Sequence, residues 1–193
     1  DLIAGLPGET VDSFAEGFNK LVALKPHEIQ FGILKRLRGA PIARHTQEYQ
    51  LRFNPAPPYN ILSTNCIDFA QMQQLSRFSR YWDILANSGR YTNTLQLILA
   101  DSAFQHFYDL TQWLYRKTRQ THAIAHERMV HLMHEYLIDS RKLDPGAVAN
   151  ALISDYRGTG GRSRLKFEEE KAVLPLPRPQ KNKKHTPDRQ TRH

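Results

Sequence analysis

The chain is 193 residues long, 40% hydrophobic and 10% aromatic, so it can bury a core in one or two domains. Its net charge of +8 comes almost wholly from residues 157–193, where eleven Lys and Arg stand against four Asp and Glu. The single cysteine, Cys66, excludes an intrachain disulfide, and no apolar stretch reaches the roughly 18 residues of a membrane span. These features predict a cytoplasmic protein without membrane contact.

The first 34 residues have the pattern of a βαβ unit. Residues 1–4 are predicted to end a buried strand and residues 5–8 (GLPG) to form a turn. Residues 28–34 largely alternate, as a strand does. Because two strands cannot make a stable sheet, we expect further strands from outside this sequence. The helix between the strands ends at Pro26, and its apolar face should pack on that wider sheet through Val11, Phe14, Phe18, Leu21, Val22 and Leu24.

The middle of the chain is predicted to be helical. After a short helix over residues 42–51 and a proline-rich loop over 53–64, apolar spacing indicates helices over 69–85, 91–119 and 121–143. The second of these should break near Asp101 and Ser102, where a new cap is available. Pro145 starts a last helix that ends near Tyr156. The fold class is therefore mainly α.

From residue 158 onward the sequence predicts a basic, disordered tail. Its Gly, Pro and Lys content cannot bury enough surface to offset the entropy of ordering. Such a tail could contact nucleic acid weakly, through charge alone. One candidate function is therefore a non-catalytic helical interaction module with a nucleic-acid-binding tail.

Few side chains suggest a site by spacing alone. The turn at residues 5–8 precedes a helix N-terminus, where backbone N–H groups favour an anion, but it lacks the Gly-Lys of a P-loop. His126 and His131 are five residues apart, so they cannot share a metal as an i, i+4 pair does. We interpret the histidines of this helix as exposed or interfacial, and Cys66 as a small buried residue or an inert thiol.

Two motifs resemble radical SAM enzymes. Residues 1–10, DLIAGLPGET, resemble the segment that ends the fifth barrel strand of that family, commonly D-L-I-x-G-L-P-G-E-T. Residues 29–42, IQFGILKRLRGAPI, resemble its sixth strand, with Ala40 in place of the usual Thr. Residues 54–64, 86–95 and 186–193 (NPAPPYNILST, ANSGRYTNTL and TPDRQTRH) resemble the helical C-terminal domain of unknown function in cobalamin-binding radical SAM proteins.

The resemblance implies three regions and a function. Residues 1–42 would be the end of a partial TIM-type radical SAM barrel, 43–157 the helical domain, and 158–193 the tail. The intact enzyme would cleave S-adenosylmethionine reductively at a [4Fe–4S] cluster to form a 5′-deoxyadenosyl radical, with or without cobalamin, and would act on an unknown substrate. By position, Ile3, Gly5 and Glu9 would line the SAM adenine pocket, and Leu34 would contact the adenine.

This sequence lacks part of what that chemistry needs. The family holds its cluster with three cysteines in C-x3-C-x2-C, whereas Cys66 is the only cysteine here. We therefore expect the earlier barrel strands and the cobalamin domain to lie outside this sequence. We also expect no catalytic or metal-ligating residue in it, and no cofactor bound by this chain alone.

Overall fold

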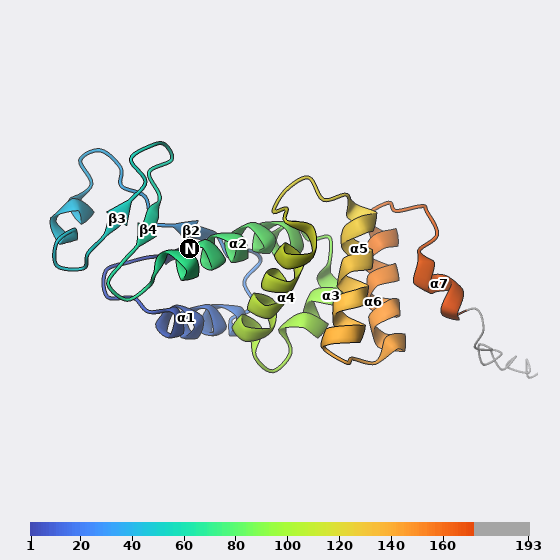
Figure 1. The fold of residues 1–193 in the computed structure, drawn as a ribbon. Helices are drawn as coiled ribbons and strands as arrows, with labels where there is room; N and C mark the ends of the chain where they lie inside the picture. The colour runs from blue at the N-terminus through green and yellow to red at the C-terminus, as the bar shows by residue number, and fades with distance from the viewer. Residues whose placement is uncertain (172–193) are drawn as a thin grey trace, which may run out of the picture.

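The computed structural model describes residues 1–171 and is mainly helical, with two small sheets (Figure 1). The β3–β4 hairpin lies at one end of the molecule and α5, α6 and α7 at the other, with α2 and α4 between them. The predicted fold class, mainly α after a βαβ unit, is confirmed. No helix among the described residues is long and apolar enough to cross a membrane.

The chain opens with the predicted βαβ unit. Strand β1 (Leu2–Ala4) and strand β2 (Phe31–Ile33) pair in parallel, and helix α1 (Val11–Ala23) connects them. Helix α1 begins with a capping box, in which Thr10 Oγ1 accepts from the Ser13 N–H (3.1 Å) and Ser13 Oγ accepts from the Thr10 N–H (3.0 Å). These short polar side chains fix where the helix starts.

The two edges of this small sheet differ. The outer edge of β2 is covered, because Ser79 Oγ donates to the Phe31 carbonyl (2.9 Å) and the Asn87 side chain bonds both the N–H and the C=O of Ile29. The bonds of Leu2 and Ala4 point toward β2, so the N–H and C=O of Ile3 point the other way. No hydrogen bond joins these two groups to any described residue. An open edge of this kind can accept another strand.

Residues 41–64 differ from the prediction. The expected helix over 42–51 is reduced to a single 3₁₀ turn, η1 (Pro41–His45). The expected loop over 53–64 contains an antiparallel pair, β3 (Arg52–Phe53) and β4 (Ile61–Ser63). Strands of two and three residues are too short for alternation to be visible in the sequence.

The predicted helices are present, with shifted bounds. Helix α2 (Phe69–Trp82) continues into a π-helical turn, η2 (Asp83–Asn87). The expected break separates α3 (Thr92–Leu99) from α4 (Ala103–Thr118), with Asp101 at φ +68° between them. Helix α5 (His126–Glu135) begins later than predicted and ends in a second π-helical turn, η3 (Tyr136–Ser140). Helix α6 (Pro145–Gly158) follows.

An aromatic cluster forms the centre of the molecule. The rings of Phe14 and Phe18 on α1 pack on β2 and on the helices, with Phe14 4.9 Å from Phe31. Phe18 lies 5.0 Å from Phe78 and 4.9 Å from Trp82, both on α2, and Phe14 lies 6.0 Å from Phe104 on α4. The βαβ unit and the helices thus share one core.

The predicted start of a disordered tail at residue 158 is wrong. Leu165 and Phe167 are buried, and the ring of Phe167 stacks on His134 at 4.1 Å. Arg157 adds an ion pair with Glu168 (2.8 Å), and helix α7 spans Lys166–Lys171. Phe167 anchors this polar segment to α5 through its ring contacts with His131 and His134. The remainder of the predicted tail, including residues 186–193, lies outside the described residues.

Helix α3 is capped by a carboxylate from another helix. Asp155 on α6 is only 5% exposed, and its two oxygens accept from the backbone N–H groups of Asn93 (3.1 Å) and Thr94 (2.8 Å) and from both their side chains. These bonds satisfy amides at the first turn of α3, where no intrahelical acceptor exists. The carboxylate therefore joins α3 to α6.

We predict that Asp155→Ala destabilises the protein by about 2–3 kcal/mol, because it leaves buried donors of α3 without acceptors. The neighbouring variant Ser154→Ala, which loses only one long contact to Asn93 (3.3 Å), should cost less than about 0.5 kcal/mol. Urea unfolding of both variants measures the difference. Equal losses in the free energy of unfolding would show that the hydrogen bonds of Asp155 stabilise the protein no more than the single contact of Ser154.

His126 is half-buried in the helical part. Its ring lies 5.4 Å from the ring of Tyr91 and 5.1 Å from that of Tyr156, and its Nε2 is buried without a hydrogen-bond partner among the described residues. Burial, and then the positive charge of Arg90, lower the pKa of His126 below its ordinary value. Of the two predicted alternatives, exposed or interfacial, His126 is interfacial and His122 is exposed.

The lowered pKa predicts a loss of stability in acid. The unfolded chain binds a proton at His126 near pH 6.5, at higher pH than the folded chain does, so the free energy of unfolding should fall as the pH drops below about 6.5. We expect His126→Phe, which keeps an aromatic ring there, to lose less stability between pH 7.5 and 5.5 than the wild type. His122→Ala serves as the control and should keep the wild-type pH dependence. Urea midpoints at the two pH values measure this, and an unchanged slope in His126→Phe would contradict it.

Candidate functional site: a cavity between the βαβ unit and helix α2

The glycine turn after β1 has the geometry that the sequence predicts. Gly5 and Gly8 adopt φ values of +92° and +78°, a region that favours glycine. Glu9 closes the turn, because its Oε2 accepts from the N–H groups of Gly5 (2.8 Å) and Leu6 (3.4 Å). The N–H donors that suggested an external anion are thus used by a carboxylate of the chain itself.

The environment of Glu9 has two opposing effects on its pKa. Burial raises the pKa of Glu9 above its ordinary value, and the two backbone N–H groups offset part of that rise by stabilising the charged form. Glu9 is half-buried beside the turn, so its main role in this structure is to hold the turn closed. Its predicted contact with the SAM adenine stays a prediction.

Gly5 is also a packing contact between the two parts of the molecule. A Cβ at this position would lie 2.6 Å from Ile61 Cγ2 on β4 and 3.1 Å from Met72 Cε on α2. Because Gly5 has no side chain, Ile61 and Met72 can pack directly against its backbone. The predicted role of Gly5 beside the adenine is not tested by this contact.

We predict that Gly5→Ala destabilises the protein by about 2–4 kcal/mol, the sum of a positive φ and overpacking against Ile61. Gly39→Ala provides the matched control. Gly39 also has a positive φ (+77°), but a Cβ there meets nothing within 4 Å, so its cost should be about 1 kcal/mol. Thermal or urea unfolding compares them, and equal costs would show that the contact with Ile61 relaxes freely.

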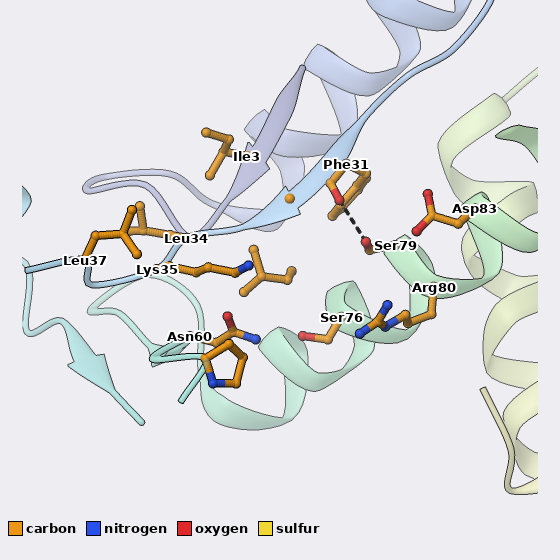
Figure 2. Close-up of a pocket in the computed structure, with 13 residues that line it drawn as sticks. Ile3, Phe31, Leu34, Lys35, Leu37, Asn60, Ser76, Ser79, Arg80 and Asp83 are labelled. Carbon is orange, nitrogen blue, oxygen red and sulfur yellow. Dashed lines mark hydrogen bonds between the residues drawn. The ribbon is translucent and has the colours of Figure 1, made fainter. Parts of the chain in front are cut away.

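A cavity of about 510 Å³ lies between the βαβ unit and α2 (Figure 2). Two of the four predicted site residues, Ile3 and Leu34, line it. The other two, Gly5 and Glu9, are bonded to each other in the turn at the carboxyl end of β1 and do not line the cavity. Of the predicted site residues, Ile3 and Leu34 therefore lie in the cavity, whereas Gly5 and Glu9 lie in the turn.

The polar lining of this cavity comes from three segments, and none of its polar side chains was among the predicted site residues. Lys35 and Asn60 are backbone partners in an isolated antiparallel bridge, so their side chains start from neighbouring positions. Ser76 and Arg80 extend from α2 on the other side (Figure 2). The only signal in the sequence was the basic run at residues 35–38, which does not reveal that α2 faces it.

A second cavity, of about 690 Å³, lies where the loop after α1 meets η2 and α3. Its lining is formed by Pro26, His27, Trp82 and Leu95, among others. None of the predicted site residues lies there, and its titratable lining residues, Lys25, His27 and Glu28, all come from the loop after α1.

The described residues do not fit an iron–sulfur cluster. They contain no group of three or more His, Cys, Asp or Glu side chains that could hold a metal ion, and Cys66 is exposed rather than buried. His131 is engaged at both ring nitrogens, with Nδ1 bonded to the Glu127 carbonyl (2.9 Å) and Nε2 accepting from the Lys166 N–H (3.2 Å). It acts as a structural link between α5 and α7.

The fold is that of a mainly helical protein built onto a βαβ unit, with a cavity at their junction. Residues 47–178 match the family described as "Protein of unknown function (DUF4080)". Because this match covers more than half of the chain, the chain belongs to that family. The match leaves the βαβ unit outside it. No curated protein and no solved structure matches the chain.

Proposed function

We propose that this chain is the C-terminal part of a radical SAM enzyme, in which the βαβ unit completes the SAM side of the barrel and the DUF4080 part closes it. The family match over residues 47–178 agrees with the resemblance of that region to a helical domain of unknown function. The substrate, and the use of cobalamin, are not specified by this proposal.

The observation that carries the proposal is the asymmetry of the β1–β2 sheet. The outer edge of β2 is closed by Ser79 and Asn87, while the outward backbone groups of Ile3 on β1 have no partner among the described residues. A sheet closed on one side and open on the other is what the last two strands of a partial barrel require. Barrel enzymes carry their sites at the carboxyl ends of the strands, where the glycine turn lies.

In this proposal the chain binds and orients SAM rather than transforming it. Ile3 and Leu34 would offer apolar contacts to the adenine from the open face of the sheet, and the Gly5–Glu9 bond would hold the turn in place beside them. SAM supplies the radical chemistry when it is bound and reduced. The cluster that reduces it would have to be held by residues outside this chain, because the cysteines it needs are not here.

The first test reads the sequence that precedes Asp1 in the source genome, where a C-x3-C-x2-C motif is expected. In the polypeptide that contains both, we predict that Ile3→Asn weakens SAM binding by tenfold or more and leaves the iron and sulfide content unchanged. Leu24→Asn is the matched control, since Leu24 is 77% exposed and does not line the cavity; it should bind SAM like the wild type. Equilibrium dialysis with labelled SAM gives both affinities. Unchanged binding in Ile3→Asn, or an unrelated upstream reading frame, would refute the proposal.

The alternative function is a non-catalytic interaction module whose basic tail contacts nucleic acid. Most of that tail lies outside the described residues, and within the described part Leu165 and Phe167 are buried, with Phe167 stacked on α5. The same upstream reading frame separates the two functions, because only the enzyme needs the cysteine motif.

A further inference from the structure

We propose that the cavity between the βαβ unit and α2 binds a small molecule that carries one anionic group, a carboxylate or a phosphate, on an apolar body. The cavity measures about 510 Å³, within the range of small-molecule sites. Identifying this molecule as the substrate rests on the proposed function, whereas the binding itself depends only on the residues described below.

One wall of the cavity is apolar and open to solvent. Leu37 is 61% exposed, and Pro58 extends the same lining beside Ile3 and Leu34, which the proposed function assigns to the adenine. Large aliphatic side chains left this exposed around a hollow can gain free energy by covering an apolar ligand. The ligand must therefore have an apolar part that reaches these side chains.

Two positively charged side chains also line the cavity, one from each side. Lys35 reaches in from the segment after β2, and Arg80 from α2 (Figure 2). Within the described part of the chain, neither side chain forms a hydrogen bond or an ion pair, so their N–H donors are available to a ligand. Guanidinium and ammonium groups together favour a carboxylate or a phosphate.

The other polar groups of the lining do not compete for this role. Ser76 Oγ donates to the Met72 carbonyl (2.9 Å) and Ser79 Oγ to the Phe31 carbonyl (2.9 Å), so both hydroxyl protons are used within the protein. Asp83, the one acidic side chain of the lining, accepts a hydrogen bond from Asn87 Nδ2 (3.0 Å). The lining keeps a net positive charge.

The side chain of Asn60 has an unpaired buried acceptor, which is a second and independent indication of a ligand. Its Oδ1 is buried and has no hydrogen bond from any described residue, although buried acceptors are nearly always paired. Asn60 is the bridge partner of Lys35, so this acceptor and the Lys35 amine start from adjacent positions on the same side of the cavity. A ligand with a hydroxyl or amine donor near its anionic group would satisfy both.

The site requires both parts of the molecule. Lys35 belongs to the βαβ side, Asn60 to the hairpin and Arg80 to α2, and the three come together because Ser79 anchors α2 to the edge of β2. The helical part therefore contributes directly to ligand recognition in this proposal, beyond covering the sheet.

The test uses this 193-residue chain labelled with ¹⁵N, without cluster or SAM, so that its result is separate from that of the SAM experiment. Octanoate and octyl phosphate are titrated against 1-octanol, which has the same apolar body without the charge. We expect the two anions to shift the amide signals of Gly32, Ser76 and Asn60 saturably, and to bind at least tenfold more tightly than 1-octanol.

Two double variants of equal charge complete the design. Lys35→Gln with Arg80→Gln should weaken octanoate binding at least tenfold and leave 1-octanol binding unchanged. Arg36→Gln with Arg38→Gln removes the same charge from exposed side chains that do not line the cavity, and should bind octanoate within twofold of the wild type. Amide spectra verify that each variant is folded. Equal loss in both variants, shifts confined to other surfaces, or 1-octanol binding as tight as octanoate would overturn the proposal.

Discussion

The aromatic contact between α1 and α2 is the constraint on which the rest of the structure depends. Phe18 meets both Phe78 and Trp82 edge to face, and Phe78 in turn lies 4.9 Å from Phe107 on α4. Edge-to-face rings add about 0.5–1.5 kcal/mol per pair beyond the area they bury. Since the cluster links α1, α2 and α4, the βαβ unit is held by the helices and does not depend on the β1–β2 pair alone.

This contact also fixes where α2 lies against the sheet. With Phe78 in the core, the next residue, Ser79, reaches the Phe31 carbonyl, and Arg80 turns to the cavity. Three consecutive residues of one helix thus face the core, the strand edge and the cavity, because successive helical positions differ by about 100°. Edge protection and the cavity therefore arise from the same helix placement, and a shift of α2 would alter both.

Local features were predictable from the sequence, and features that join distant segments were not. The capping residue Thr10, the positive-φ glycines and the break at Asp101 each follow from residues that are neighbours in the chain. The two lining residues Lys35 and Arg80 are 45 positions apart, and their common cavity depends on how α2 packs. The contacts of Phe14 and Phe18 with α2 and α4 could not be predicted for the same reason, because the spacing of an apolar helix face does not indicate which helix covers it. The order of residues 158–168 depended on two side chains, Leu165 and Phe167, in a segment whose average composition is polar.

The glycine turn illustrates how a site can be arranged before any ligand arrives. An isolated turn with free N–H groups would lose conformational entropy when a ligand bound and ordered it. Here the hydrogen bond from the Gly5 N–H to Glu9 already orders the turn. The raised pKa of Glu9 shows that burial opposes the charge and that the two backbone donors recover only part of the cost. Gly5 is held on its other side by Ile61 and Met72, so the turn is fixed from both the strand and the helical part. Ile3 lies two residues before Gly5 on β1. Its position is therefore set by contacts within the protein and does not depend on a ligand.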